Sequence, residues 1–364
     1  MKIKRLTLDQ FTVFEETEFE FSEGINILIG ENGTGKSHLL KIVYCLIKAN
    51  EEPDTEREKK MKQAFPEDWM GQKISNVFRP AGGGFQRLIS RQIGGATANV
   101  SLQTDGGETS LRLTSQGKLY LDKNSIRPNQ RSIFIPSREV LSICSSLLNA
   151  YKTVNLNFDE TYYDLANELL RPTLRGPRGD RAGKMVKPLE AIINGIVYEE
   201  NGIFYVKQGR TQSAIEAHLL AEGWRKIASL CRLILNGSLF KNSILFWDEP
   251  EANLNPQLIK PVCNILRKLA ELGVQIFVST HDYLLTNELS LTAEYSDKST
   301  KGQSPLVRFI GLLRNAEGGT DKQVGDTLPE IKDNPILAAF ARHYDEEEDL
   351  LDKAAGTSGE TMRK

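Results

Sequence analysis

The segment INILIGENGTGKS, residues 25–37, decides the fold. Its first five residues form a short, mostly apolar run of the kind that is buried in a parallel sheet. Residues 30–37 then fit the pattern G-x-x-x-x-G-K-[ST], and a helical pattern continues to residue 46. Glycines let the backbone curl so that successive N–H groups point into one concavity, and the following helix adds its positive end. The order of strand, loop and helix therefore predicts a phosphate-binding loop.

The residues of this loop would divide the work of holding ATP and Mg²⁺. Lys36 would reach the β- and γ-phosphates and act in catalysis, and the Ser37 hydroxyl would ligate Mg²⁺. Contacts to the cofactor are expected from Gly30, Glu31, Asn32, Gly33, Thr34, Gly35, Lys36, Ser37 and His38. The alternative is a glycine-rich turn that matches the pattern by chance, and the flanking strand and helix argue against it.

A second apolar run, Ile244–Trp247, ends in two acids. Ligands bind at the carboxyl ends of strands in α/β sheets, so we assign Asp248 to Mg²⁺ and Glu249 to the attacking water, as catalytic base or polarising group. His281 follows the next apolar run, residues 274–279, and would hydrogen-bond a γ-phosphate oxygen and hold that water. A strand that ends in two acids is common by itself, but its pairing with the phosphate loop favours the catalytic interpretation.

Together these residues resemble the ABC ATPase superfamily. Residues 248–250, residues 253–256 and the isolated His281 resemble its Walker B, D-loop and H-loop in order and spacing. The opening of the chain, residues 2–33, is similar to the branch that contains RecF, SMC and OLD proteins. The resemblance implies an ATP-dependent head-to-tail homodimer, or a higher homo-oligomer of such dimers, with Asn255 near the interface.

The family's signature motif, LSGGQ, should lie shortly before Walker B at the start of a helix. Residues 220–226, LAEGWRK, lie there, and the resemblance assigns Ala221, Glu222 and Gly223 to the partner's nucleotide. Ala221 replaces the family's serine, so that hydroxyl contact is missing. Backbone N–H groups at the helix N-terminus, or the charges of residues 225–226, would take its place. An ordinary amphipathic helix is the alternative interpretation.

The predicted fold class is α/β: an ABC-ATPase head with a mixed sheet, an antiparallel β arm and a helical insertion lobe, without a long coiled coil. We expect residues 171–188 to be a loop, residues 306–313 to be the last strand, and a C-terminal helix over 335–344. Residues 135–139 occupy the place of the family's Q-loop without a glutamine, so the Q-loop residue stays open. The expected divisions are 1–140, ATPase lobe I with the β-rich arm; 141–210, a helical and hairpin insertion; 211–315, ATPase lobe II with the signature, Walker B, D-loop and H-loop; and 316–364, the C-terminal helix and a disordered tail.

Composition excludes several classes of protein. The formal net charge of the 364 residues is −2, which disfavours a globally basic nucleic-acid binder. The four cysteines are far apart and form no CxxC pair, which indicates a reducing compartment rather than a disulfide framework. No apolar run approaches the roughly 20 residues that cross a bilayer. We therefore expect a cytoplasmic protein that is not inserted in a membrane.

Several hypotheses of function follow from the resemblance. The first is an ATPase with slow turnover whose nucleotide-driven dimerisation regulates a separate effector, a nuclease or toxin, as in bacterial anti-phage modules such as the Septu and PARIS systems. The second is a RecF-like repair ATPase that binds DNA. A scaffold that binds ATP but scarcely hydrolyses it is a third, and a transporter ATPase is the least favoured. Six basic residues between Arg171 and Lys187 are candidates for contacts with nucleic acid, although a solvated loop is the preferred interpretation.

Overall fold

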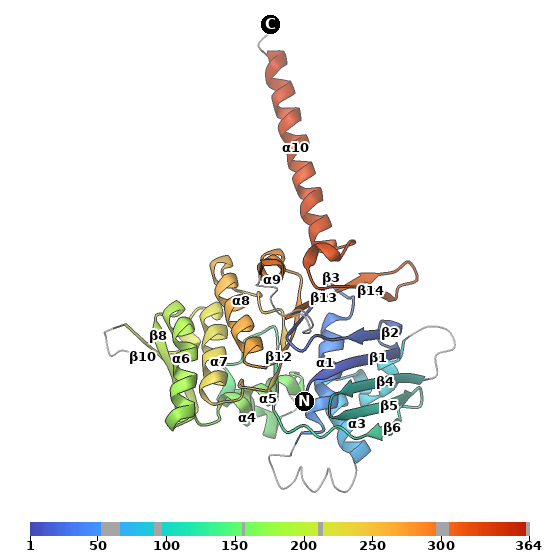
Figure 1. The fold of residues 1–364 in the computed structure, drawn as a ribbon, viewed down its shortest axis with the longest axis vertical. Helices are drawn as coiled ribbons and strands as arrows, with labels where there is room; N and C mark the ends of the chain where they lie inside the picture. The colour runs from blue at the N-terminus through green and yellow to red at the C-terminus, as the bar shows by residue number, and fades with distance from the viewer. Residues whose placement is uncertain (52–65, 91–96, 155–156, 210–213, 296–305, 362–364) are drawn as a thin grey trace.

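Two large sheets form the centre of the described chain (Figure 1). The computed structural model describes residues 1–51, 66–90, 97–154, 157–209, 214–295 and 306–361. The larger sheet has five parallel strands and one antiparallel edge strand, which confirms the predicted mixed sheet. Its order is β14 (Thr320–Gly325), β13 (Val307–Arg314), β3 (Ile25–Gly30), β12 (Gln275–Thr280), β11 (Ile244–Asp248) and β7 (Ser132–Ile135).

The smaller sheet is antiparallel throughout. Its order is β2 (Phe14–Glu20), β1 (Ile3–Phe11), β4 (Thr97–Thr104), β5 (Gly107–Thr114) and β6 (Leu119–Asn124). The segment predicted as a β arm therefore extends the N-terminal sheet, because β4 pairs with β1 along most of its length.

Strand β3 is central because both of its faces are buried. Ile25, Ile27 and Ile29 pack into one hydrophobic core, whereas Leu28 packs into the other. The polar exception, Asn26, is satisfied: its side chain donates to the Ser22 carbonyl at 2.9 Å. This alternation has the period of two that a strand requires, and the phosphate loop follows a strand whose residues are all buried.

Helices cover both faces of the larger sheet. α1 (Lys36–Lys48) begins at the phosphate loop and shares one core with residues of both sheets, and α3 (Pro66–Phe78) packs against it. The opposite face carries α4 (Cys144–Thr153), α5 (Glu160–Leu169), α6 (Gly176–Ile192), α7 (Glu222–Leu235), α8 (Pro256–Glu271), α9 (Tyr283–Tyr295) and the small sheet of β8 (Gly195–Glu200), β9 (Ile203–Gln208) and β10 (Ala214–Glu216).

Buried charges also hold α1 in place. Lys73 on α3 lies 3.1 Å from a Glu160 carboxylate oxygen and donates to Asp164 at 2.8 Å. Tyr44 on α1 donates its hydroxyl to the same Asp164 at 2.6 Å. Burial and the neighbouring Asp164 charge raise the pKa of Tyr44 well above its usual value. Removing one partner from such a buried group leaves the others uncompensated, so the contact between α1, α3 and α5 is costly to break.

The prediction of a loop over residues 171–188 is wrong, because α6 begins at Gly176. Pro177 lies in its first turn, where its missing N–H removes no intrahelical hydrogen bond. Ala182, Val186 and Leu189 recur at helical spacing and are fully buried, and α6 packs against α7. This packing outweighs the low helix propensity of the glycines. The basic side chains of the segment therefore lie mainly on a helix.

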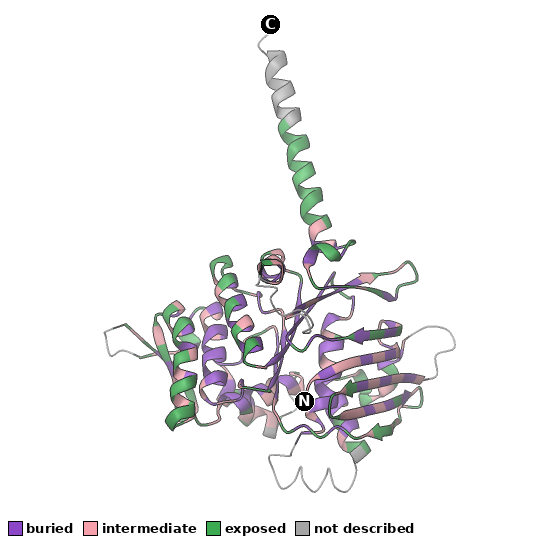
Figure 2. Ribbon diagram, viewed as in Figure 1, coloured by how far each residue is buried: buried purple, intermediate pink, exposed green. Residues whose placement is uncertain are grey.

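Two predictions for the C-terminal part are also wrong. β13 is not the last strand, since β14 follows it and pairs with it antiparallel. α10 (Pro335–Thr361) continues through the acidic run and through most of the tail predicted as disordered. Glu, Leu, Lys and Ala favour helix, so the acidic run extends α10 instead of ending it. α10 leaves the body of the protein, and side chains 338–351 are exposed (Figures 1 and 2). Across the described residues, no helix combines the length and apolar character needed to cross a bilayer.

The aromatic cluster under β11 gives a test of the core. Phe246 is fully buried, and its ring centroid lies 5.1 Å from that of Phe277. We expect Phe246→Ala to lower the free energy of unfolding by about 3–5 kcal/mol, measured by chemical denaturation. Val324→Ala, at an exposed position of β14, should change it by less than about 0.5 kcal/mol. Equal effects of the two substitutions would contradict this packing.

Candidate active site

The phosphate loop has a preformed shape. Gly33 and Gly35 have φ of 84° and 93°, a conformation that glycine adopts without a steric penalty. A Cβ on Gly35 would lie 2.7 Å from the Phe14 ring, so the β1–β2 turn packs directly on the loop. From the other side, Thr320 of β14 donates its hydroxyl to the Thr34 carbonyl at 3.2 Å. The N-terminal sheet and the β13–β14 hairpin thus hold the loop between them.

Lys36 lies inside this loop. Its buried Nζ donates to the carbonyls of Gly30 at 2.7 Å and Glu31 at 2.9 Å. Burial lowers the pKa of Lys36, while the nearby charges of Glu249 and Asp248 act to raise it. The predicted cation and the two predicted acids therefore face one another across the end of the sheet.

Asp248 connects two of the strand ends. It accepts a hydrogen bond from the Ser37 hydroxyl at 3.0 Å and another from the Ser279 hydroxyl. Asp248 and Ser279 are paired in register on β11 and β12. Hydroxyl and carboxylate oxygens are the hard ligands that Mg²⁺ prefers, so this donor set fits the cation. Sequence reasoning did not identify Ser279, because only the pairing of β11 with β12 brings it next to Asp248.

Glu249 and His281 also lie together. Glu249 has φ 49°, which is uncommon outside glycine, and its N–H donates to the Ser279 carbonyl at 3.0 Å. His281 Nδ1 lies 3.5 Å from Glu249 Oε1 and 3.7 Å from Glu251 Oε1. The two residues predicted to handle the attacking water are thus neighbours at one edge of the sheet.

Glu251 is a residue of this site that sequence reasoning missed. It is only 9% exposed, and its Oε1 accepts from the Thr280 hydroxyl at 2.7 Å and the His281 N–H at 3.2 Å. Within the described chain its buried Oε2 has no hydrogen-bond partner. Burial raises the pKa of Glu251, and the hydrogen bonds partly oppose that shift. In the sequence Glu251 has the pattern of an exposed acidic residue in a turn. Only the fold shows that its side chain is buried.

The segment assigned to the signature starts a helix, as expected. Ala221 is the N-cap residue of α7 and offers no side-chain hydrogen bond to the first turn. A Cβ on Gly223 would lie 3.1 Å from the Asn253 carbonyl oxygen, so the helix start packs closely on the turn after β11. Asn253 also donates its side-chain amide to Glu222 at 2.9 Å.

The two basic residues after this segment are held by the chain itself. Lys226 is buried and donates to the Ala252 carbonyl at 2.6 Å and the Glu249 carbonyl at 3.4 Å. Arg225 Nε lies 3.0 Å from a carboxylate oxygen of Glu139, a residue in the place of the Q-loop. Both side chains therefore have partners within the chain itself.

Three other predicted contacts have local structural roles. Asn255 caps α8, because its Oδ1 accepts from the Gln257 N–H at 3.0 Å. His38 is exposed, and its ring centroid lies 5.7 Å from that of Phe78. The third predicted contact, Asn32, accepts at its carbonyl from Arg314 of β13 at 3.5 Å. Their contacts with nucleotide stay predictions.

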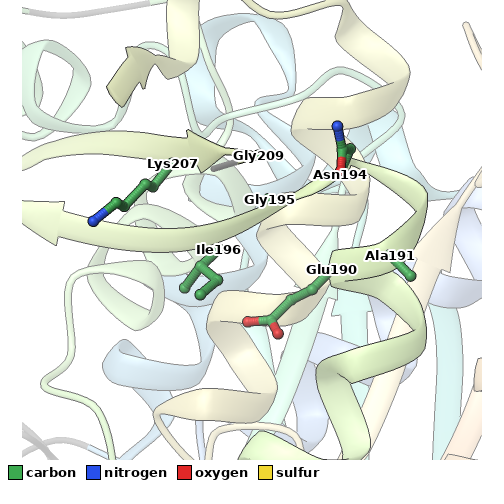
Figure 3. Close-up of a pocket in the computed structure, with 7 residues that line it drawn as sticks. All are labelled: Glu190, Ala191, Asn194, Gly195, Ile196, Lys207 and Gly209. Carbon is green, nitrogen blue, oxygen red and sulfur yellow. The ribbon is translucent and has the colours of Figure 1, made fainter. Parts of the chain in front are cut away.

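A surface hollow of about 360 Å³ lies away from these residues, between the carboxyl end of α6 and the β8–β9 hairpin (Figure 3). Its lining includes Glu190, Asn194, Ile196 and Lys207. None of its lining residues belongs to the phosphate loop or to the strand ends that carry the acids.

Two family models match successive parts of the chain. The first, "AAA ATPase domain", matches residues 1–80, which contain the phosphate loop. The second, "AAA domain, putative AbiEii toxin, Type IV TA system", matches residues 119–287, which contain Asp248, Glu249 and His281.

Curated proteins and solved structures agree with these matches. The DNA replication and repair protein RecF of Macrococcus caseolyticus is 47% identical over 49 residues, 14% of this chain and 13% of that protein. The DNA double-strand break repair Rad50 ATPase of Thermoplasma acidophilum is 26% identical over 139 residues, 38% of this chain and 15% of that protein. The matches therefore span a small part of these relatives. An Smc head bound to the C-winged helix domain of ScpA aligns with a TM-score of 0.54 and 13% identity, over 90% of this chain and 98% of that one.

The fold is similar to that of an Smc head, and the two matched segments are similar to ATPase domains. The matched families and relatives make the chain similar to ATPases of the RecF and Rad50 type.

The buried Glu251 carboxyl gives a test of the site. Folding raises the pKa of Glu251 above the ordinary 4.5, so the wild type loses stability as pH rises from about 4.5 toward the folded pKa. Glu251→Gln has no titrating group at this position and lacks that loss. We expect the free energy of unfolding of the variant, relative to the wild type, to increase over that pH range in denaturant titrations. The exposed Glu317→Gln serves as the control and should show no such trend. A pH-independent difference for Glu251→Gln would show that this carboxyl is not buried as described.

Proposed function

We propose that this chain binds ATP with Mg²⁺ and hydrolyses it slowly, and that nucleotide-driven pairing of two copies regulates a separate effector protein. One observation carries the proposal: five side chains from three segments lie together at the carboxyl edge of β3, β12 and β11, namely Lys36, Ser37, Asp248, Glu249 and His281. This edge is where α/β sheets hold their ligands.

The arrangement supports a division of labour among these side chains. Mg²⁺, when bound, would neutralise charge on the phosphates, and Ser37 and Asp248 would hold it. Lys36 would exchange its contacts with loop carbonyls for phosphate oxygens. Glu249 would orient water and accept its proton, with His281 placed 3.5 Å from that carboxylate to orient the same water.

The start of α7 supports pairing with a second copy. The first turn of a helix has N–H groups without intrahelical partners, and Ala221 supplies no side-chain cap for them. A γ-phosphate held by another copy would satisfy these donors and benefit from the helix dipole. Asn255, close in sequence to the turn that packs on α7, would then lie near the interface.

The proposed role in bacterial anti-phage defence is supported by the family description that covers residues 119–287, which names a toxin and a type IV toxin–antitoxin system. An ATPase of this kind would act in the cytoplasm and control a nuclease or toxin carried by another polypeptide. A RecF-like repair ATPase that binds DNA is the second candidate, and the RecF match at 47% identity favours it.

Substitution of the proposed base tests the chemistry. Glu249→Gln should lower ATP turnover by at least about a hundredfold and leave ATP binding intact, because the amide keeps the size of the side chain but accepts no proton. Lys36→Ala should instead abolish ATP binding in calorimetry. The exposed Glu317→Gln is the matched control for turnover. Wild-type turnover in Glu249→Gln would reject the base, and normal ATP binding by Lys36→Ala would reject the phosphate-loop assignment.

Binding of duplex DNA separates the two candidate roles. For the effector-regulating ATPase we expect no ATP-dependent gain in affinity for DNA at physiological salt. A RecF-like protein would bind duplex DNA more tightly with ATP, with an affinity that falls steeply as salt rises. Fluorescence anisotropy of a labelled duplex over a salt series measures both quantities, and Lys36→Ala is the control for the effect of ATP.

A further inference from the structure

Large apolar side chains of α10 are more than half exposed, although Ile336 is buried and the Phe340 ring also lies 5.0 Å from that of Tyr283. Phe340, Tyr344 and Leu351 are 56%, 62% and 63% exposed, and their spacing of four and seven residues places them on one face of the helix. An isolated helix in water is only marginally stable, and its stability in proteins comes mainly from packing of such a face. α10 therefore has the pattern of a docking element.

The same helix carries a block of negative charge. Residues 345–349, DEEED, are exposed, and within the described part of the chain none of them forms an ion pair. Arg342 is the one basic residue among the described side chains of α10. Two copies of α10 side by side would bring these acidic runs together, and like charges at an interface are unfavourable. A basic occupant would complement this charge.

A matching basic surface lies on α6. Its solvent face is opposite the buried Ala182, Val186 and Leu189, and only Asp180 and the half-buried Glu190 oppose its positive charge. As far as the structure describes the chain, the basic side chains of this face form no ion pair. They are Arg178, Arg181, Lys184 and Lys187, all exposed, and their spacing of three residues spreads them around about half of the helix, with Arg178 nearest the buried stripe.

The hollow in Figure 3 adjoins the carboxyl end of this basic face. Ile196, which lines it, is 57% exposed, so the surface there is partly apolar. Lys207 lines the same hollow and adds a positive charge. A hollow of about 360 Å³ has the size of small ligand pockets and would admit an aromatic side chain.

We propose that α10 of one copy docks on α6 of a second copy. The acidic run then lies over the basic face of α6, and Tyr344, just before that run, lies toward the hollow at the carboxyl end of α6. This order makes the two helices antiparallel, an arrangement that their dipoles also favour. The contact joins two copies because α10 leaves the protein on a different side from its own α6 (Figure 1). It needs no nucleotide, so it is separate from the proposed ATP-driven pairing.

Charge reversal tests this contact in the full chain without nucleotide. One variant carries Arg178→Glu, Arg181→Glu, Lys184→Glu and Lys187→Glu; the other carries Glu347→Lys and Glu348→Lys, the acids nearest the face of Phe340, Tyr344 and Leu351. At low salt the wild type should self-associate in sedimentation velocity. Each variant alone should associate at least about tenfold more weakly, because like charges then face each other. An equal mixture of the two variants should associate again, since each supplies the surface that the other needs.

The controls separate a lost contact from a lost fold. Lys118→Glu with Lys123→Glu, on and beside β6, should leave self-association unchanged. Both reversal variants should keep the circular dichroism spectrum of the wild type. If either fails to fold, glutamine replacements at the same positions take its place, and they should also weaken association. A wild type that is monomeric without nucleotide, or a mixture that fails to associate, would overturn the proposal. So would loss of duplex DNA binding in the α6 variant with unchanged self-association, because that result would make α6 a nucleic-acid surface.

Discussion

The hydrogen bonds that Asp248 accepts from Ser37 and Ser279 are the contacts on which the site depends. They exist because β3, β12 and β11 are parallel neighbours in fixed register, with both faces buried. A shift of one residue in any of these strands would move its apolar side chains to the wrong core. The hydrophobic cores therefore set the positions of the polar groups at the strand ends.

Much of this could be predicted from sequence because the signals are local. The apolar run Ile25–Ile29, the glycine pattern that follows it and the two acids after Trp247 each lie in one short segment. The general rule that parallel strands present their carboxyl ends at one edge then brings them together. The α/β class, the mixed sheet and the meeting of Ser37 with Asp248 all follow from these elements.

The rest depends on contacts between distant segments. Glu251 is buried because Thr280 and His281 from the next strand lie over it, and a single sequence contains no sign of that contact. The burial of Lys226 also depends on a distant segment, since its hydrogen-bond partners are carbonyls of the turn after β11. For α6, the glycines and basic residues suggested a loop, and only packing against α7 shows that Ala182 and its helical neighbours form a core-facing stripe. The composition of a segment indicates whether its residues tolerate solvent, but it does not show which other segment will pack against it.

The β13–β14 hairpin connects α10 to the phosphate loop. Through Thr320 and Arg314 it touches the phosphate loop, and the short segment 326–334 connects it to α10. A movement of α10 would thus be coupled through this hairpin to the backbone of the phosphate loop. Thermodynamic reciprocity then requires that any ligand of α10 which prefers the filled loop also tightens nucleotide binding by the same factor.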